Sequence, residues 1–259
     1  MAKNWMIWDK NLEYGNTFYM RAIGKLPEME SSKSIARYAG KIIKNNDSIL
    51  DVGCGVGHYL VSLDKTIGTN FSYYGLDATK YYIQKAKKAF SLRNKLNPRR
   101  IKTDFFVGDI FNLKLENNFA DIVMCNNLLL HLPSINRPLR ELWRVTKRFL
   151  LIRTLVGDSS FRIMHINEPE RYAEDGEPVN FNYLNIYSKQ YLRKLIRKLS
   201  NVKKVSMFAD NDFNPRKIGN PNYSNRKAPF NLTKVVNGMQ VNHYIIYPWY
   251  LIIIEKNLP

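Results

Sequence analysis

The sequence predicts an α/β fold in which helices cover both faces of a mainly parallel sheet. Three observations predict it. The stretch Ser48–Tyr59, SILDVGCGVGHY, is typical of a buried strand that ends in a tight glycine turn before a helix. From Ser48 to Thr154 strand-like and helix-like apolar patterns alternate regularly. Asp77 stands 20 residues after Gly57, at the end of the second apolar run.

The expected elements follow the hydrophobic pattern along the chain. Strands are placed on short apolar runs, and helices on stretches whose apolar residues recur at helical spacing. Pro27 opens the first helix and Ser188 is the N-cap of the last one. The expected helices are Glu28–Ile43, a helix that carries Leu60, Val61 and Leu63, Thr79–Leu96, Ser134–Thr146 and Ser188–Leu199. The expected strands are Ser48–Gly53, Phe71–Leu76, Asp104–Val107, Asp121–Cys125, Lys147–Thr154, Asn201–Phe208 and Tyr244–Glu255.

Length and composition favour one folded domain with additional segments. The chain has 259 residues and is 45% hydrophobic, enough for one large core. No apolar run approaches the length of a membrane span, and the N-terminus lacks a signal-peptide core, so a reducing cytoplasmic location is expected. The two cysteines, Cys54 and Cys125, are then expected to be small buried residues rather than a disulfide or a metal pair.

The chain is strongly basic. Lys and Arg number 40 against 22 Asp and Glu, which gives a formal charge of +18. Such an excess favours an anionic partner, for example a phosphate-bearing substrate, a nucleic acid or a membrane surface. Abundant Lys beside many Asn, Ile and Tyr residues also suits an AT-rich coding sequence. Both interpretations stay open at this point.

The glycine turn distinguishes two kinds of ligand. Glycines allow positive φ and a close approach of ligand to backbone, and the following helix presents unpaired N–H groups. A dinucleotide fingerprint needs a third glycine where His58 stands. Asp51 instead precedes the glycines, and D-V-G-C-G-V-G resembles motif I of class I S-adenosylmethionine-dependent methyltransferases. The resemblance implies cofactor contacts in this turn, the acidic residue holding the methionine end, and the residues are Asp51, Gly53, Cys54, Gly55 and Gly57.

Two further carboxylates fit the same cofactor. Asp77, with Ala78 beside it, can accept hydrogen bonds from both ribose hydroxyls, although an NAD enzyme uses the same geometry and a helix cap competes for this carboxylate. Asp109 follows the third expected strand. In methyltransferases that this chain resembles, an acidic residue there contacts the adenine amino group, and an apolar neighbour, here Ile110, stacks on the ring.

The end of the fourth expected strand is the second strong signal. ADIVMCNNLLLHLP resembles the motif IV region of small-molecule methyltransferases related to those of ubiquinone biosynthesis. This resemblance implies that Asn126 and Asn127 border the reaction centre and that His131 lies near enough to act as a general base. His165 and His243 are the other candidate bases. The run lacks the Pro-Pro-aromatic sequence of amino-methylating DNA enzymes and the carboxylates of magnesium-dependent catechol-type enzymes, so no metal is expected.

The remaining segments are expected to select the acceptor. Residues 1–47 form an N-terminal segment rich in aromatic residues that resembles the lid helices of related methyltransferases, and 48–259 form the methyltransferase domain. Loops at about 157–187 and 210–243 are the expected acceptor-binding insertions. By the same family resemblance, a seven-stranded sheet is expected whose last strand is antiparallel and lies beside the sixth. Pro248 argues for an edge or a bulge in that strand.

The function expected from these residues is methyl transfer from S-adenosyl-L-methionine. The acceptor is expected to be small and anionic, phosphate-bearing or a nucleotide-activated sugar, and methylated at oxygen. The C-terminal stretch VNGMQVNHYIIYPWYLIIIEK resembles methyltransferases of bacterial surface-polysaccharide gene clusters, which implies a role in surface glycan or capsule synthesis. Two alternatives stay open: an RNA methyltransferase, favoured by the charge, and a catalytically silent partner protein with a cofactor fold. The sequence does not select an oligomeric state.

Overall fold

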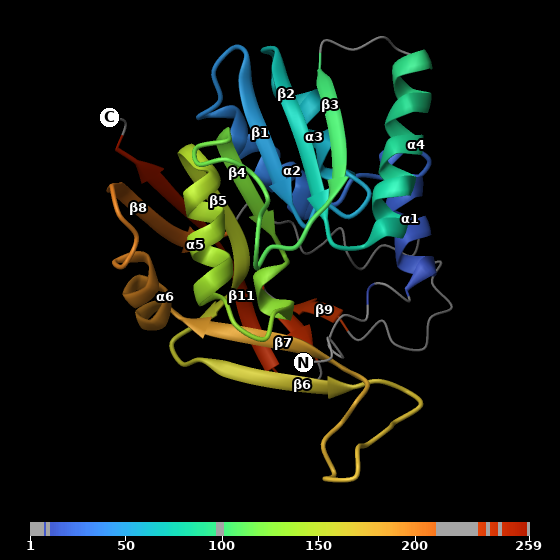
Figure 1. Cartoon of the computed structure of the whole chain (residues 1–259), viewed down its shortest axis with the longest axis vertical. Coiled ribbons are helices and arrows are strands. Elements are labelled where there is room, and N and C mark those ends of the chain that lie inside the picture. Colours follow the sequence, from blue (N-terminus) through green and yellow to red (C-terminus); the bar gives the residue numbers. More distant parts are fainter. Residues whose placement is uncertain are drawn as a thin grey trace.

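A central sheet with helices on both faces organises the computed structural model (Figure 1). The structure describes residue 8 and residues 11–96, 101–210, 233–236, 239–242 and 245–257. Five strands run parallel in the order β3, β2, β1, β4, β5, with bounds β1 Asp47–Val52, β2 Phe71–Asp77, β3 Lys102–Val107, β4 Ala120–Asn126 and β5 Thr146–Gly157. The strand order reverses between β1 and β4. Ligands of open α/β sheets bind at the carboxyl ends of the strands beside such a reversal.

The expected antiparallel last strand is present. β11 (Ile245–Lys256) runs antiparallel to β5 and also pairs with β8 (Val202–Ala209), the sixth strand of the prediction. The prediction of an edge or bulge at Pro248 is wrong in one respect, because β11 lies inside the sheet. Pro248 stands where β11 changes partner from β10 to β5, so its missing N–H falls at the end of both ladders.

The helices divide between the two faces of the sheet according to the alternation of the strand residues. Ile49 contributes to a core with α1 to α4, whereas Leu50 and Val52 contribute to a core with α5 and α6. The helix bounds are α1 Leu12–Ala22, α2 Glu30–Gly40, α3 Tyr59–Thr66, α4 Lys80–Leu96, α5 Asn136–Val145 and α6 Lys189–Ile196. Ser188 caps α6 as predicted, since its Oγ accepts from Tyr191 N–H at 3.0 Å. Among the described residues, no helix combines the length and apolarity needed to cross a bilayer.

The segment 157–187, expected to be a loop, is largely a hairpin. β6 (Phe161–Ile166) pairs antiparallel with β7 (Phe181–Ser188), and the end of β7 continues the sheet beside β5. Neither strand shows a clear period of two in the sequence. β6 is mostly exposed, and β7 carries the buried polar residue Asn185 among its apolar ones. The sheet also gains β9 (Thr233–Val236) and β10 (Met239–Asn242), so within the described part of the chain it has eleven strands rather than seven.

Cys54 and Cys125 are buried free thiols in the core, as predicted. Cys54 lies in the turn after β1 and Cys125 in the neighbouring strand β4. Among the described residues, no group of His, Cys, Asp and Glu side chains is arranged to hold a metal ion.

Gly75 in the middle of β2 provides a test of this packing. A Cβ at this position would lie 2.5 Å from Cδ1 of Phe105 and 3.0 Å from Sγ of Cys54. We expect Gly75→Ala to lower the free energy of unfolding in urea by about 1–3 kcal/mol, the usual effect of overpacking a core. Gly68→Ala is the matched control, because no heavy atom lies within 4 Å of its added Cβ. Equal stability of the two variants would contradict the packing described here.

Candidate active site

A cavity of about 180 Å³ opens at the carboxyl ends of β1, β2 and β4. Its walls are the glycine turn after β1, the residues after β2 and β3, the asparagine pair after β4, and aromatic residues of the N-terminal segment. Most of the predicted site residues lie here. Those that line the cavity are Gly53, Gly55, Asp77, Ala78, Asp109, Ile110, Asn126, Asn127 and His131. No Lys or Arg side chain lines it among the described residues.

The glycine turn is held against β2. The backbone N–H groups of Gly53 and Cys54 both donate to the carbonyl oxygen of Leu76, at 2.7 and 3.0 Å. The three glycines have φ of +80°, +56° and +70°, a region that favours glycine. Gly57 and Cys54 do not line the cavity. A Cβ on Gly57 would lie 2.7 Å from the Phe105 ring, so this glycine permits core packing beneath the turn.

Asp51 is buried below the cavity rather than in its wall. It is 2% exposed, and Tyr73 Oη–H donates to its Oδ2 at 2.7 Å. Burial raises the pKa of Asp51 to about 7, against the lowering effect of the Tyr73 hydrogen bond, and the charge of Asp77 raises it further. Direct contact between this carboxylate and a ligand, as the sequence resemblance implies, is not part of this geometry.

Asp77 combines two roles that the sequence presented as competitors. Its Oδ1 accepts from Thr79 N–H at 2.9 Å, at the start of α4, and its Oδ2 accepts from Gly55 N–H at 2.8 Å. An ionised carboxylate has about four acceptor sites, and Asp77 lines the cavity, so this carboxylate can also accept from a ligand hydroxyl there. Asp109 is similar, since its Oδ1 accepts from Phe111 N–H at 2.9 Å while the residue lines the cavity.

The asparagine pair behaves asymmetrically. Asn126 is 8% exposed, and neither its amide oxygen nor its amide nitrogen has a hydrogen-bond partner among the described residues. Asn127 has φ +56°, donates to Tyr59 Oη at 3.1 Å and accepts from Arg153 Nη1 at 2.7 Å. A buried amide without a partner is destabilising by about 1–3 kcal/mol. The Asn126 amide is therefore a position for a polar ligand group.

Arg153, at 1% exposure, supports this wall from below. Its Nε donates to Asp210 Oδ2 at 2.7 Å, and its guanidinium lies 4.1 Å from the ring centroid of Trp249. Asp210 also accepts from Ser34 Oγ at 2.5 Å. Sequence reasoning missed this network. Its only signal was an arginine inside the apolar fifth strand, and a partner 57 residues away cannot be read from spacing.

His131 is held in a defined tautomer. A carbonyl oxygen only accepts, so Nδ1 carries the proton that bonds Tyr183 O at 2.9 Å, and Nε2 keeps its lone pair. Burial lowers the pKa of His131, and the hydrogen bond to Tyr183 opposes this effect. Of the other candidate bases, His165 is exposed on β6, opposite Asn182, and does not line the cavity, whereas His243 lies outside the described residues.

β7 fixes the short 3₁₀ helix η2 (Leu129–His131) through three hydrogen bonds. Besides the bond to His131, Asn185 Nδ2 donates to Leu132 O at 2.7 Å, and Tyr187 Oη donates to Leu129 O at 2.8 Å. The strand that sequence reasoning placed in an acceptor loop thus holds the histidine. No feature of the sequence distinguishes Asn185 and Tyr187 as residues that hold η2.

The aromatic N-terminal segment lies over the glycine turn. Trp8, Tyr14 and Phe18 line the cavity, and Phe18 stacks on the His58 ring at 4.1 Å and 12°. Burial lowers the pKa of His58 to about 3, and neither of its ring nitrogens has a partner among the described residues. The segment is placed where a lid would act, and the lid role itself stays a prediction. Trp5, also noted in this segment, lies outside the described residues.

A family model described as a methyltransferase domain matches residues 43–198, from just before β1 to the end of α6. The chain belongs to this methyltransferase family. An uncharacterised methyltransferase of Schizosaccharomyces pombe is 33% identical over 116 residues, which are 44% of this chain and 41% of the relative. Sterol 24-C-methyltransferase of Kluyveromyces lactis is 33% identical over 121 residues, 45% of this chain and 31% of that protein. The matched region is thus less than half the length of these curated relatives.

Solved structures support the same fold. Magnesium protoporphyrin IX methyltransferase from Synechocystis PCC 6803, solved with bound S-adenosylmethionine, has a TM-score of 0.57 at 14% identity and covers 99% of both chains. The class I methyltransferase fold predicted from motif order is therefore confirmed. The matched family region includes the glycine turn, both carboxylates, the asparagine pair and His131.

Asp51 predicts a pH dependence of stability. Its pKa in the folded protein lies above the ordinary 3.8, so the folded state binds this proton more tightly than the unfolded chain. The stability from this proton is lost as the pH rises from about 4 to about 7. We expect Asp51→Asn to become more stable relative to the wild type over this range, by about 2–4 kcal/mol in denaturant unfolding at each pH.

Asp121→Asn is the matched control with the opposite sign. Burial raises the pKa of Asp121, but hydrogen bonds from Ser48 and Lys147 outweigh it and lower the pKa. The wild type should gain stability over this variant as the pH rises through the acidic range to about 4, and the difference should then stay constant up to pH 7. A pH-independent difference for Asp51→Asn would show that its pKa is not raised.

Proposed function

We propose that this chain transfers a methyl group from S-adenosylmethionine to a small-molecule acceptor, at oxygen. The observation that carries the proposal is the amide of Asn126, which has no hydrogen-bond partner in the described part of the chain and is buried in the same cavity wall as the carboxylates of Asp77 and Asp109. The family model and the solved neighbours support S-adenosylmethionine as the cofactor of this site.

The residues present fit that cofactor. A Cβ on Gly53 would lie 2.6 Å from Leu128 and one on Gly55 3.2 Å from Phe18, so a cofactor chain would pass close to this backbone where these two side chains give way. Asp77 lines the cavity with a carboxylate that would accept from the ribose hydroxyls. Asp109 would accept from the adenine amino group, with Ile110 against the ring. Three motif residues do not line the cavity: Asp51, Cys54 and Gly57. They would hold the glycine turn in shape from below and would not contact the cofactor. When bound, S-adenosylmethionine supplies an activated methyl group.

The N-terminal segment has to move for the cofactor to enter. A cavity of about 180 Å³ is smaller than the roughly 300–1,000 Å³ typical of ligand pockets, and Phe18 would lie 3.2 Å from a Cβ on Gly55. Displacement of the Phe18 ring from His58 enlarges the cavity beside Gly55. On return, Trp8, Tyr14 and Phe18 exclude water from the reacting atoms, which is the lid role we propose for residues 1–47.

His131 is the proposed general base. Its Nε2 lone pair takes the proton of an acceptor hydroxyl as that oxygen acquires the methyl group. The Nδ1–H bond to Tyr183 O fixes this tautomer and orients the ring, and the edge of Trp8, with centroids 5.2 Å apart, limits its rotation. Because burial disfavours the imidazolium, the ring is neutral and able to accept a proton near pH 7.

The acceptor class rests on the sequence. We propose an anionic acceptor, phosphate-bearing or a nucleotide-activated sugar, in surface glycan or capsule synthesis, supported by the C-terminal resemblance and the charge of +18. No cation lines the described cavity wall, so basic residues of the 210–243 insertion would have to bind the anion. The candidates Arg216, Lys217, Arg226 and Lys227 lie outside the described residues, as does Tyr223. Residence in the cytoplasm also stays a prediction.

Cofactor binding is tested by calorimetry with S-adenosylmethionine and S-adenosylhomocysteine. Removing a carboxylate that accepts two hydroxyls loses charge-assisted hydrogen bonds, so we expect Asp77→Ala to weaken both ligands about 10–100-fold. Asp158→Ala is the matched control, because Asp158 is exposed and remote from the cavity. Absence of binding to the wild type at millimolar ligand would refute the proposed function.

Base catalysis is tested separately, with methyl-labelled cofactor and a panel of sugar-phosphate and nucleotide-sugar acceptors. We expect His131→Gln to reduce kcat about 10²–10⁴-fold without a change in cofactor affinity. The wild-type rate should rise with pH through the histidine range and then level off, because only the neutral ring accepts the proton. Full activity of His131→Gln would assign the proton to another group.

A further inference from the structure

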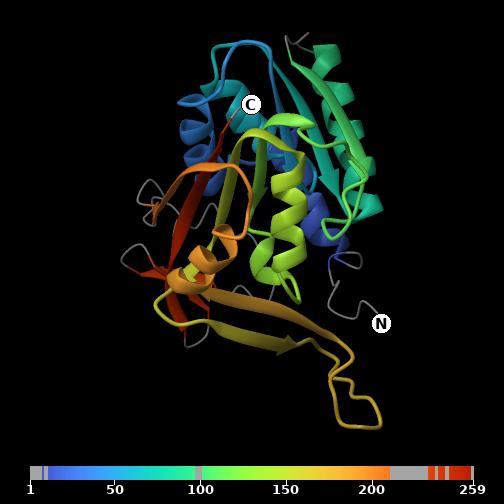
Figure 2. The ribbon, with the colours of Figure 1, turned by 60° about the vertical axis from the view of Figure 1, so that its left-hand side comes forward.

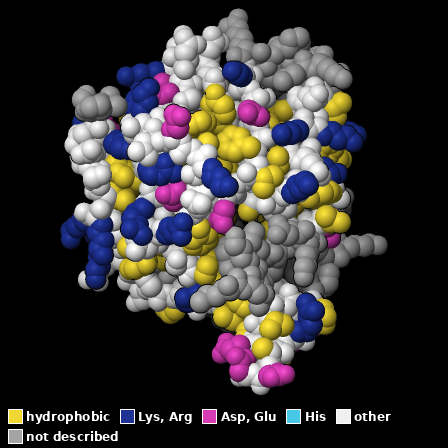
Figure 3. Space-filling model, viewed as in Figure 1, with side chains coloured by type: hydrophobic (Ala, Val, Ile, Leu, Met, Phe, Trp, Pro, Cys, Tyr) yellow, Lys and Arg dark blue, Asp and Glu magenta, His cyan; other side chains and the backbone are white. Residues whose placement is uncertain are grey.

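The tip of the β6–β7 hairpin concentrates negative charge on a basic protein. Residues 168–177, EPERYAEDGE, hold five of the 22 carboxylates of the chain and a single arginine, Arg171. Every residue from 168 to 177 is exposed, and Tyr172 is 51% exposed among the carboxylates. Figure 3 shows these acidic side chains together at the lower end of the molecule. We call this segment the acidic tip.

The acidic tip is ordered by its own contacts. Val179 N–H donates to Arg171 O at 2.9 Å, Ala173 N–H to Glu177 O at 2.8 Å, and Tyr172 Oη–H to Glu170 Oε2 at 2.7 Å. Figures 1 and 2 show the hairpin extending away from the sheet, with the tip at its far end. An ordered projection of one charge sign presents a defined surface to a partner of the opposite sign.

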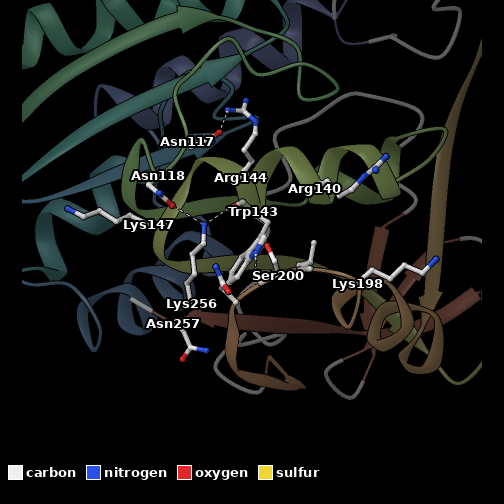
Figure 4. A pocket seen from close by; sticks show the side chains of 12 residues that line it. Asn117, Asn118, Arg140, Trp143, Arg144, Lys147, Lys198, Ser200, Lys256 and Asn257 are labelled. Carbon is white, nitrogen blue, oxygen red and sulfur yellow. Dashed lines mark hydrogen bonds between the residues drawn. The ribbon is translucent and has the colours of Figure 1, made fainter. Parts of the chain in front are cut away.

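A groove of opposite charge lies at the end of the sheet that is remote from the glycine turn. It has a volume of about 880 Å³ and is lined by five cationic side chains and no Asp or Glu among the described residues. We call it the basic groove, and its cations are Arg140, Arg144, Lys147, Lys198 and Lys256 (Figure 4). The groove lies between the end of α5, the turns before β4 and β8, and the end of β11. These are the strand ends remote from the glycine turn.

The cations of the groove fall into two groups. Arg144 pairs with Glu141, Lys147 lies 3.2 Å from Asp121, and Lys256 Nζ donates to Asn118 and to the carbonyls of Trp143 and Thr146. Arg140 and Lys198 are exposed, and no ion pair joins them to a described residue. These two side chains are available to an external carboxylate.

The tip and the groove cannot meet within one chain. In Figure 1 the hairpin tip lies at the bottom, whereas the end of α5 and the start of β8, which border the groove, lie at the upper left. We propose that the acidic tip of one copy docks into the basic groove of a second copy. Charge complementarity selects this occupant, because the groove is cationic and the tip is the densest carboxylate cluster in the sequence. Tyr172 supplies an aromatic anchor among the charges.

The contact is electrostatic, so it depends on salt. The Debye length falls from about 10 Å at 0.1 M to about 3 Å at 1 M ionic strength, which screens exposed carboxylates from exposed cations. We expect sedimentation velocity of the full chain at low salt to show a sedimentation coefficient that rises with protein concentration. Addition of salt to about 1 M should return the chain to monomers. A monomer at all concentrations in low salt would overturn the proposal.

Charge-reversal variants identify the two surfaces. Glu174→Lys with Glu177→Lys alters the tip, Arg140→Glu with Lys198→Glu alters the groove, and each pair should weaken association at least tenfold. The matched control is Lys87→Glu with Lys88→Glu on the exposed face of α4, which reverses two charges without touching the groove. Circular dichroism and thermal unfolding check that each variant is folded.

Mixing the two altered proteins provides the decisive measurement. In either variant alone, the reversed residues of one surface meet unreversed residues of the same sign on the other surface. In the mixture, the reversed tip residues of one protein meet the reversed groove residues of the other, and their signs are opposite again. We expect the mixture to associate to within about threefold of the wild type. Failure of the mixture to associate, or equal weakening by the α4 control, would overturn the proposal. A groove variant that loses affinity for single-stranded RNA, with a wild type that stays monomeric, would assign the groove to nucleic acid instead.

Discussion

The hydrogen bonds of Asp77 are the constraint on which the site depends. One carboxylate oxygen accepts from the turn after β1 and the other from the start of α4, so the ends of two neighbouring strands are tied together. Gly53 and Cys54 add the reciprocal tie, since their N–H groups bond the carbonyl of Leu76. The glycine turn is therefore shaped by β2 as much as by its own sequence. Its positive φ values make these contacts possible at low strain.

A second layer of support lies below the asparagine pair. Arg153 and Asp210 form a buried ion pair that reaches Asn127 on one side and Ser34 on the other. Breaking such a pair leaves an uncompensated charge and is typically destabilising by about 3–5 kcal/mol. This arrangement joins β5, the segment after β8 and α2 behind the cavity. The network uses the side-chain amide of Asn127 and not that of its neighbour Asn126. The Asn126 amide therefore stays available to a ligand.

Sequence reasoning placed the strands of the central sheet and most of the residues that line the cavity at their ends, because local patterns determine both. Glycine spacing, carboxylates at strand ends and the asparagine pair all come from residues close in the chain. It failed where the answer depends on distant partners. Asp51 follows the motif, yet Tyr73 on the adjacent strand draws its carboxylate beneath the cavity. Arg153 finds Asp210 only through tertiary structure, and the hairpin after β5 lacks a period because one strand is exposed and the other buries Asn185.

The three hydrogen bonds from β7 to η2 make the hairpin and His131 one mechanical unit. A displacement of β7 would therefore shift η2 and His131, and a displacement of η2 would shift β7. Insertions or deletions between Ile166 and Phe181 would lengthen or shorten the hairpin and leave its three hydrogen bonds to η2 in place. Loss of β7 would remove the hydrogen bond that orients the His131 ring, so this strand supports the residue that we propose as the general base.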